Sequence, residues 1–448
     1  MNVTIIIPLH NSKKYINECM DSVVNQTLQE IEIICIDSGS DETSDIIESY
    51  ARNDKRIKYI YDDNSSYGYK INKGISLAQG KYIAIIESDD YARKDMIQVL
   101  YELAEKNCVD FIKSDFKKSI DLNGRRVESN VEQIPNKLLY NRVINLNEEQ
   151  QFKDFIGYNI WVGLYRKEFL ISNKIVLNES PGASYQDTGF SILISLLAKK
   201  VYFTDHLLYS YRIDNDESSV KSQTKYRCII DEFRWIKEQM QSRGIDNLDN
   251  LTFYKNKKLL SYFWNYKRLS KEYQIKFLKE IREEIECDYY LSLNYLETLS
   301  HQQINEVKLL YGDVEAANMY ERNKEKEQFN FRNVVSIINS KKQIVIFGAG
   351  HYGEVLMLLA NIINKNENIV SICDNDKQKY NREIFGLRVG DPESTVSKYK
   401  SAFYLCANKK SSKDILLQLN SYGVLKDNIC AVEVLPGKST ILEAVLNL

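Results

Sequence analysis

The stretch Lys81-Tyr82-Ile83-Ala84-Ile85-Ile86-Glu87-Ser88-Asp89-Asp90-Tyr91 is an apolar run that ends in three carboxylates within four residues. A run of β-branched residues is typical of a parallel strand covered on both faces, and ligands of open α/β sheets gather at the carboxyl ends of the strands. Crowded carboxylates repel one another unless a cation neutralises them, and their oxygens suit Mg²⁺ or Mn²⁺ bound together with substrate phosphates. The alternative is an Asp-rich turn that only caps the helix expected from about Arg93.

Length and composition describe an ordinary globular protein. The 448 residues suggest roughly two to four domains, and the formal net charge of −2 indicates no general role in binding nucleic acid. The eight cysteines include no Cys-x-x-Cys pair, which favours reduced thiols in a cytoplasmic protein. A strand begins within three residues of the first residue, so we expect no signal peptide. No apolar run approaches the ~18 residues that a membrane span needs. Contact with the inner face of the cell membrane would therefore be peripheral.

Strands and helices alternate through the first hundred residues. Buried strands are expected at 3–8, 31–36, 57–61 and 81–86, with helices between them. This alternation builds a parallel sheet, so Pro8, Asp37 and the acidic loop at 87–90 should line one crevice.

Four short motifs lie along these elements. Ile-Ile-Pro-Leu-His-Asn at 6–11, Ile-Asp-Ser-Gly-Ser-Asp at 36–41, Asn-Lys-Gly-Ile at 72–75, and Gly-Lys-Tyr-Ile with Glu-Ser-Asp-Asp at 80–90 resemble, in this order, the signature of family-2 glycosyltransferases. The resemblance implies the GT-A fold, a sheet that binds a nucleotide-diphosphate sugar with the help of an Asp-x-Asp metal motif.

The resemblance also implies a set of substrate and metal residues. The donor nucleotide would lie along the first two strand ends and the third helix, with Glu87 or Asp89 near the ribose, and Mg²⁺ or Mn²⁺ would bind Asp89, with Asp90 as a further ligand. Family members often have an Asp in place of Ser38 and an Arg in place of Ile71, for which Lys70 and Lys73 are nearby substitutes. The substrate-binding residues expected in this region are Pro8, Asn11, Asp37, Ser38, Lys70, Asn72, Glu87 and Ser88.

Three later segments complete the expected site. In the family an acid at the position of Asp187 is the catalytic base. Gln186 stands here where the family usually has another acid. The alternative role for Asp187 is to cap the helix that follows it. Trp161 is either a core anchor or a sugar platform. The polar loop from Arg212 to Val220, with Asp214, Asp216, Ser218 and Ser219, is similar to the family's flexible lid, in which Arg212 or His206 could meet the diphosphate.

The residue pattern changes twice in the remainder of the chain. From 225 to 332 we expect long helices whose mixed aromatic and basic residues form core or, alternatively, a face for a membrane or an acceptor. From Gln343 a strand, a glycine turn and a helix predict a half-sized Rossmann-like unit. A nucleotide there would contact Gly348, Gly350, Gly353 and Asp374.

Together these patterns predict an α/β chain with three parts: a GT-A domain at 1–222, a helical linker or acceptor region at 223–338 and a Rossmann-like domain at 339–448. The function they favour is a metal-dependent inverting transfer of a sugar, most simply from a UDP-sugar, to a hydroxyl of a glycan or lipid-linked acceptor in bacterial surface polysaccharide synthesis. A nucleotidyltransferase acting on sugar phosphates and a non-catalytic nucleotide-sugar-binding scaffold are the alternatives. The sequence specifies neither the sugar, the linkage nor the oligomeric state.

Overall fold

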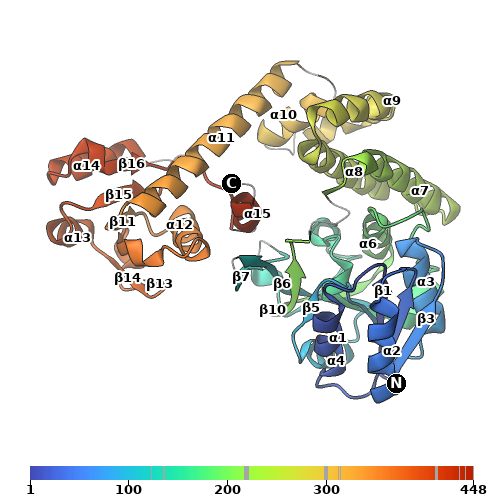
Figure 1. Cartoon of the computed structure of the whole chain (residues 1–448). Coiled ribbons are helices and arrows are strands. Elements are labelled where there is room, and N and C mark those ends of the chain that lie inside the picture. The colour runs from blue at the N-terminus through green and yellow to red at the C-terminus, as the bar shows by residue number, and fades with distance from the viewer. Residues whose placement is uncertain are drawn as a thin grey trace. The chain divides into compact units, whose positions relative to one another are not determined.

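A computed structural model describes the chain except for residues 123, 135–136, 216–220, 297–300, 311, 313, 409–411, 433, 439 and 447–448. The chain divides into two compact units. The first comprises Met1–Ser119 and Asn130–Ala316, and the second comprises Ile120–Ser129 and Ala317–Leu448 (Figure 1).

The first unit is built on one mixed sheet, in the order β3-β2-β1-β4-β9-β6-β10-β5, with β8 paired to β10; β7 pairs with β6, and residues 120–129 of that pair count with the second unit. β1, β2, β3 and β4 are mutually parallel, as their alternation with helices predicts, and β9 joins them antiparallel. The strands are β1 (Val3–Leu9), β2 (Ile31–Asp37), β3 (Ile57–Tyr61), β4 (Tyr82–Ile85), β5 (Tyr91–Ala92), β6 (Phe111–Leu122), β7 (Arg125–Val131), β8 (Val143–Asn145), β9 (Gly163–Arg166) and β10 (Lys200–Arg212).

Helices cover both faces of this sheet. Alternate side chains of β1 point to opposite faces, so Ile5 packs with the core under α1, α2 and α4 while Ile6 packs with the core under α3 and α6. The helices of these layers are α1 (Ile16–Val24), α2 (Thr43–Asn53), α3 (Tyr67–Leu77), α4 (Met96–Asn107), α5 (Lys167–Ser172) and α6 (Gln186–Leu197).

The expected helical region follows, as α7 (Cys228–Ser242), α8 (Leu248–Arg268), α9 (Lys271–Leu296), α10 (His301–Leu310) and α11 (Val314–Ser340). The aromatic side chains of α8 are mostly buried, which supports the core interpretation of this stretch. Among the described residues, no helix is both long and apolar enough to cross a bilayer.

The second unit contains a smaller sheet in the order β13-β14-β12-β11-β15-β16, parallel except for β13. Leaving out β13, the chain order across the sheet is 3-2-1-4-5, the arrangement of a doubly wound Rossmann-like sheet. Its elements are β11 (Ile344–Phe347), α12 (His351–Ile362), β12 (Ile369–Cys373), β13 (Glu383–Ile384), β14 (Leu387–Gly390), α13 (Pro392–Lys398), β15 (Phe403–Cys406), α14 (Ser412–Ser421), β16 (Ile429–Ala431) and α15 (Ile441–Leu446).

Candidate active site

The carboxyl ends of β1, β2 and β4 meet at one edge of the large sheet. Leu9 pairs in register with Asp37, and the loop after β4 begins beside them with Glu87. The two loops are joined directly, because the hydroxyl oxygens of Ser12 and Ser88 lie 2.7 Å apart. The structure therefore brings the first, second and fourth sequence motifs together.

Asp37 closes the turn after β2. Its Oδ1 accepts a hydrogen bond from the Gly39 amide at 2.8 Å, and its Oδ2 accepts one from the Tyr59 hydroxyl at 3.2 Å. Gly39 is required here, because an added Cβ would lie 2.6 Å from the backbone nitrogen of Asn11. The Asn11 side chain accepts from the Ser40 amide, and Ser38 lies 3.1 Å from the His10 ring nitrogen.

Lys70, on α3, lies at the same corner of the sheet and is buried. Its Nζ donates to the Leu9 carbonyl at 2.7 Å. Burial lowers the pKa of Lys70 to about 8, although the negative charges of Asp37 and Glu87 oppose that shift. Asn72, two residues on, instead holds the 177–179 segment, donating to the Leu177 carbonyl and accepting from the Leu177 amide.

Glu87 is held by a tyrosine that the motifs do not include. The Tyr67 hydroxyl, from the first turn of α3, donates to Glu87 Oε1 at 2.6 Å. Burial raises the pKa of Glu87 to about 8, and the charges of Asp89 and Asp187 add to the shift while the Tyr67 bond opposes it. Glu87 is thus a carboxyl group with a fixed orientation.

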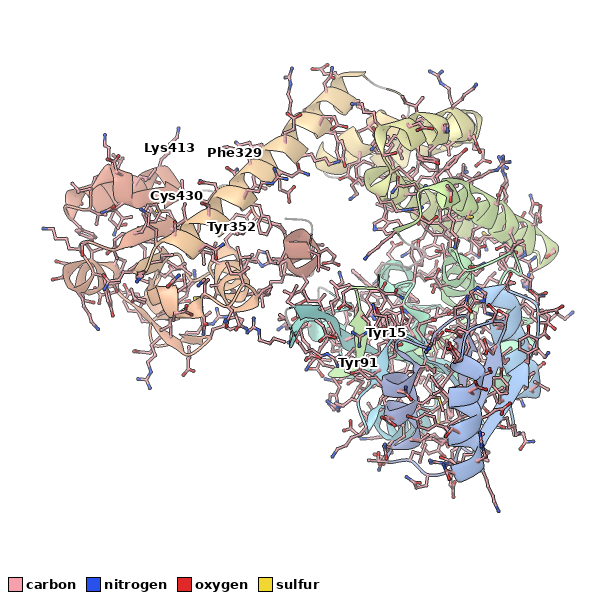
Figure 2. The ribbon with its side chains drawn as sticks, in the orientation of Figure 1. Tyr15, Tyr91, Phe329, Tyr352, Lys413 and Cys430 are labelled. Carbon is pink, nitrogen blue, oxygen red and sulfur yellow. The ribbon has the colours of Figure 1, made fainter. Side chains whose placement is uncertain are left out.

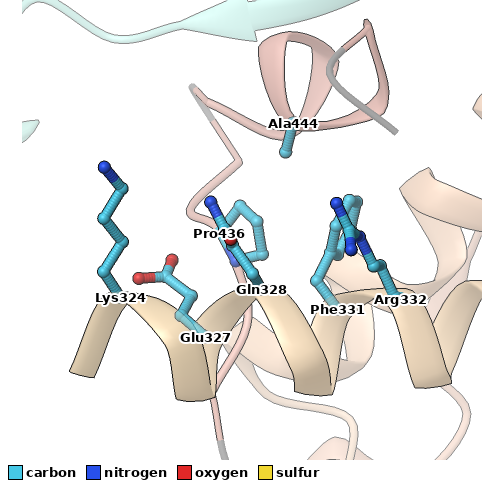
Figure 3. Close-up of a pocket in the computed structure, with 7 residues that line it drawn as sticks. All are labelled: Lys324, Glu327, Gln328, Phe331, Arg332, Pro436 and Ala444. Atoms are coloured by element: carbon cyan, nitrogen blue, oxygen red, sulfur yellow. The ribbon is translucent and has the colours of Figure 1, made fainter. Parts of the chain in front are cut away.

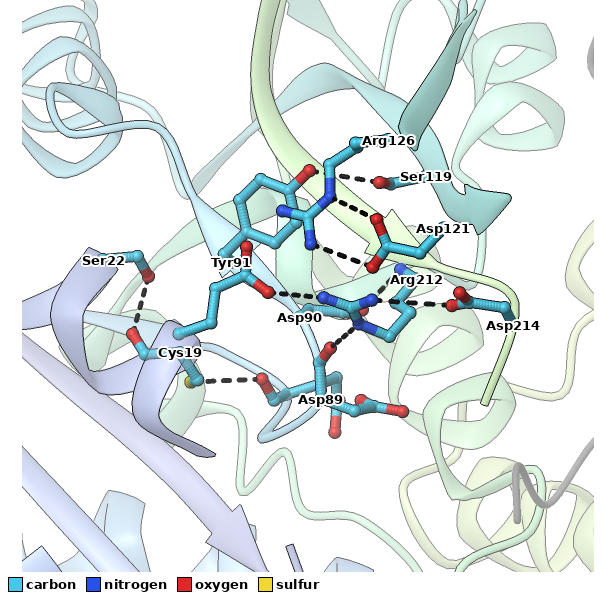
Figure 4. A network of polar contacts seen from close by, with 12 residues as sticks. Cys19, Ser22, Asp89, Asp90, Tyr91, Ser119, Asp121, Arg126, Arg212 and Asp214 are labelled. Carbon is cyan, nitrogen blue, oxygen red and sulfur yellow. Dashed lines mark hydrogen bonds and ion pairs between the residues drawn. The ribbon is translucent and has the colours of Figure 1, made fainter. Parts of the chain in front are cut away.

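Asp90 is buried and braces the acidic loop (Figure 4). Its Oδ2 accepts from the Tyr209 hydroxyl at 2.8 Å, and its Oδ1 accepts from the Arg212 amide at 2.7 Å. The Tyr209 hydroxyl in turn accepts from the Glu87 amide at 3.1 Å. Burial and the adjacent Asp89 raise the pKa of Asp90 well above its ordinary value. One tyrosine on β10 therefore connects both ends of the loop.

Arg212 lies at the end of β10 and is only 4% exposed. Its guanidinium donates to the Asp89 carbonyl at 3.0 Å and pairs with Glu18 and Asp214 (Figure 4). The ring of Tyr15, labelled in Figure 2, lies 4.7 Å from the guanidinium carbon. Asp216, Ser218 and Ser219 of the expected lid lie outside the described residues.

Asp89 is the more accessible of the two aspartates, with an Oδ2 that accepts from the Asn215 side chain at 2.8 Å. Within the part of the chain that the structure describes, no three His, Cys, Asp or Glu side chains form a ready-made metal site. Mg²⁺ and Mn²⁺ are commonly bound by one or two carboxylates together with substrate phosphates. The hard oxygens of Asp89, on a braced loop at the ligand edge of the sheet, fit that mode of binding.

Asp187 lies in the first turn of α6, near enough to the acidic loop for its charge to contribute to the raised pKa values of Glu87, Tyr67 and Tyr211. Its Oδ1 accepts from the Thr188 amide at 2.8 Å. Burial raises the pKa of Asp187 to about 6, opposed by that amide and by the charge of Lys113. Asp187 is thus a stronger base than an exposed aspartate.

Two buried ionisable groups that the sequence motifs did not indicate, Lys113 and Glu232, interact electrostatically with Asp187. Lys113 on β6 is fully buried, its Nζ donates to the Gly157 carbonyl at 2.5 Å, and burial lowers its pKa to about 7. Glu232 on α7 is also buried, and burial raises its pKa to about 8, with the charge of Asp187 adding to the shift. Neither residue belongs to a local motif that could have signalled it.

Trp161 is packed in the core beside the site. It stacks on Tyr209 and Tyr211 at ring-centre distances of 4.5 and 5.0 Å and meets Phe116 edge-on at 4.8 Å. With 7% of its surface exposed, it supports the strand that carries Tyr209, as the core interpretation predicts.

The glycine turn of the second unit is tightly closed. Gly348 has a φ of 115°, and a Cβ on Gly353 would lie 2.0 Å from the Gly348 carbonyl oxygen, whereas a Cβ on Gly350 would meet open space. Asp374 does not point outward: its Oδ2 accepts from the Ala349 amide at 2.7 Å and from Lys379 Nζ at 3.0 Å. The carboxylate expected to bind a ribose thus closes the turn, and nucleotide binding here stays a prediction.

A hollow of about 250 Å³ also lies in the second unit, between α11 and the segment leading into α15 (Figure 3). Phe331 and Pro436 form its apolar part, and Glu327 and Arg332 are among its charged residues. No residue of the expected site lines it.

Comparisons with known proteins agree with this geometry. The family model described as "Glycosyl transferase family 2" matches residues 4–163. The chain is 34% identical to the uncharacterized glycosyltransferase EpsJ of Bacillus subtilis (strain 168) over 249 residues, which cover 54% of this chain and 68% of EpsJ. The chain belongs to glycosyl transferase family 2.

Two further proteins of known activity or structure are similar to this chain. The poly(ribitol-phosphate) beta-glucosyltransferase of Bacillus spizizenii (strain ATCC 23059 / NRRL B-14472 / W23) is 28% identical over 224 residues, covering 48% of this chain and 33% of that protein. The crystal structure of S. aureus TarS 1–349 in complex with UDP-GlcNAc superposes with a TM-score of 0.56 at 18% identity, covering 73% of this chain and 92% of TarS 1–349. This likeness shows a shared GT-A fold.

Proposed function

We propose that this family-2 enzyme transfers a sugar from a nucleotide-diphosphate donor, most simply a UDP-sugar, to a hydroxyl of a glycan or lipid-linked acceptor, with inversion at the anomeric carbon. The observation that carries the proposal is that the carboxyl ends of β1, β2 and β4 meet at one edge of the sheet, with the partly exposed Asp89 on a loop that Tyr209 and Arg212 hold in place. The charge of Asp187 interacts with that of Glu87 on the same loop, which supports a role for Asp187 in the reaction. The UDP-GlcNAc complex of TarS 1–349 supports a UDP-linked donor.

The nucleotide would lie across the ends of β1 and β2. Asp37 is 1% exposed and its two oxygens already accept from Gly39 and Tyr59, so, like Asp90, it would shape this corner rather than contact the base directly. Lys70, buried beside the Leu9 carbonyl, supplies positive charge nearby. Glu87 and Ser88 stand at the end of β4, where the ribose would follow.

Asp89 would hold Mg²⁺ or Mn²⁺ against the diphosphate, and the chemistry the ion supplies there is neutralisation of the charge on the leaving group. Asp90 contributes by bracing rather than by ligation, because its oxygens already accept from Tyr209 and Arg212 inside the protein. The position of Asp89 therefore depends on the end of β10.

Asp187 accepts the proton of the acceptor hydroxyl. As the acceptor oxygen bonds to the anomeric carbon, the bond from that carbon to the diphosphate oxygen breaks, and a nucleoside diphosphate leaves from the opposite side. The raised pKa of Asp187 brings the base closer to neutral pH, where proton transfer is more favourable. The cleft adds the positioning that makes the attack effectively intramolecular.

The acceptor is proposed to belong to a bacterial surface polysaccharide. The similarity to a poly(ribitol-phosphate) beta-glucosyltransferase supports a polymeric acceptor. We further propose that the enzyme acts in the cytoplasm, with peripheral contact at the inner face of the membrane where a lipid-linked acceptor would lie.

A screen of nucleotide sugars tests the proposal. The purified chain is incubated with each nucleotide sugar in Mn²⁺, in Mg²⁺ and in EDTA, and released nucleoside diphosphate is measured. We expect release from one donor, dependent on the cation. Release of pyrophosphate would indicate a nucleotidyltransferase, and binding of donor without any release would indicate a scaffold.

Two variants test in the same assay whether Asp89 binds the cation. Asp89→Asn should require at least ten times more Mn²⁺ for half-maximal release. Asp246→Asn, at an exposed aspartate before α8, is the matched control and should behave like the wild type. An unchanged Mn²⁺ requirement in Asp89→Asn would overturn the metal assignment.

A further inference from the structure

One aromatic side chain of α8 departs from the pattern of its neighbours. Phe253, Tyr254, Tyr262, Phe263 and Tyr266 are all at most 8% exposed, as core residues of an amphipathic helix should be. Trp264 lies in the same run and is 43% exposed. It presents a large apolar ring to solvent in the first unit.

Trp264 is nevertheless held in place. The Tyr185 ring meets it edge-to-face at 6.2 Å with an interplanar angle of 84°, and the Arg268 guanidinium carbon lies 5.8 Å from its ring centre. The Tyr185 hydroxyl accepts from Arg268 Nε at 2.9 Å and donates to Asn265 Oδ1 at 2.8 Å. The exposed indole thus has a fixed orientation, which lowers the entropy cost of binding a ligand.

Tyr185, which contacts Trp264, lies close in sequence to the proposed catalytic base. Tyr185 occupies the position before α6 with a φ of 66°, in the left-handed region, and Asp187 follows two residues later. The Tyr185 side chain contacts α8, through Trp264 and Asn265, while Asp187 lies in the first turn of α6. The residue that packs against the exposed indole is therefore two positions from the proposed base in the chain.

We propose that Trp264, together with Tyr185 and Arg268, forms a binding subsite for a sugar ring of the acceptor. The C–H groups on one face of a pyranose carry partial positive charge and are attracted to the face of an aromatic ring, as cations are. A sugar seated on Trp264 would place a hydroxyl of the same or the next sugar at Asp187. This inference rests on the proposed function and specifies which part of the chain recognises its acceptor.

A membrane surface is the competing occupant, because exposed tryptophans also insert at the headgroup level. An interfacial tryptophan is oriented as well, with its apolar body in the bilayer and its N–H toward water, so a fixed ring suits either occupant. The choice of a sugar rests on the neighbouring chain, because Tyr185, which packs against the ring, lies two residues before the proposed base Asp187.

The test compares Trp264→Ala with Trp264→Phe and with Leu260→Ala. Leu260 lies one turn earlier on α8 and is 46% exposed, so it controls for loss of exposed apolar surface. Labelled di- and trisaccharides serve as acceptor probes with the donor found in the screen. We expect Trp264→Ala to raise the acceptor KM at least tenfold and Trp264→Phe to raise it less than threefold. Leu260→Ala should leave the acceptor KM unchanged. The donor KM and the hydrolysis of donor without acceptor should stay the same in all three variants.

Fluorescence gives a second measurement that needs no turnover. The chain has three tryptophans, of which Trp161 is buried and Trp235 half-buried, so Trp264 dominates the solvent-sensitive signal. We expect at least one oligosaccharide of the panel to quench the wild type and not Trp264→Ala. If no nucleotide sugar is hydrolysed, the proposed function fails while this titration still decides on the subsite.

Three results would overturn the subsite. One is an unchanged acceptor KM in Trp264→Ala, and another is the absence of quenching by every oligosaccharide of the panel. The third is loss of co-sedimentation with phosphatidylglycerol vesicles in Trp264→Ala without any change in acceptor KM, which would assign the ring to a membrane surface.

Discussion

Replacing Asp187 by Asn separates a catalytic base from a helix cap. The amide has nearly the same shape and keeps an oxygen that can accept from the Thr188 amide at the position of Oδ1. It carries no charge and is not a base. We therefore expect kcat to fall by about 10²–10⁴, the usual contribution of a general base, and we expect the fold to become more stable.

The magnitude of the stability change follows from the pKa. Burial raises the pKa of Asp187 from 3.8 to about 6, and about two units correspond to roughly 3 kcal/mol. Because the folded state holds this proton more tightly than the unfolded state, the free energy of unfolding decreases as the pH rises from about 4 to about 6. Above that range the full penalty is present in the wild type and absent in Asp187→Asn.

Urea unfolding followed by tryptophan fluorescence measures this difference. All three tryptophans lie in the first unit, so the signal reports on the unit that contains Asp187. We expect Asp187→Asn to exceed the wild type by up to about 3 kcal/mol at pH 8 and by less at pH 5. A residue that only caps α6 predicts the opposite sign, a loss of about 0.3–1 kcal/mol from the missing negative charge at the helix N-terminus. A less stable or fully active Asp187→Asn would refute the assignment.

Three further changes test the surroundings of the site. Lys113→Met removes a positive charge that lowers the pKa of Asp187, so the acidic limb of the kcat/KM profile should move up by about one pH unit. Tyr209→Phe leaves the buried Asp90 without its hydroxyl donor and should lower the free energy of unfolding, measured in urea, by about 1–3 kcal/mol. Gly39→Ala places a methyl group against the neighbouring loop and should raise the donor KM at least tenfold without changing the acceptor KM.

The sequence was sufficient to predict the edge of the sheet where the site lies. Apolar strands that alternate with helices must lie parallel, so Asp37 and Glu87 were expected together before any packing was known. The same holds for the small C-terminal sheet, whose strand order agrees with the Rossmann-like pattern. Chain order is enough to place the carboxyl ends of these parallel strands at one edge, although it does not specify that β4 lies beside β1 or β15 beside β11.

Contributions from later strands could not be predicted in this way. β9 inserts antiparallel between β4 and β6, and β10 lies beyond them, so that Lys113 and Tyr209 reach the site by a non-sequential strand order. β10 is one long strand from Lys200 to Arg212, with an irregularity between Thr204 and Leu207. Only tertiary packing sets these positions, and no short motif records them.

The acidic motif shows why the fold is needed to assign roles. Asp89 and Asp90 are identical in type and adjacent in sequence, so the motif alone offers either as a ligand. Tyr209 and the backbone of Arg212 bind Asp90 inside the protein, where a cation would have to displace them. Because those bonds fix the loop, the neighbouring Asp89 keeps its partly exposed position. We therefore propose that the end of β10, more than one hundred residues away in sequence, decides which of the two aspartates can bind the metal ion.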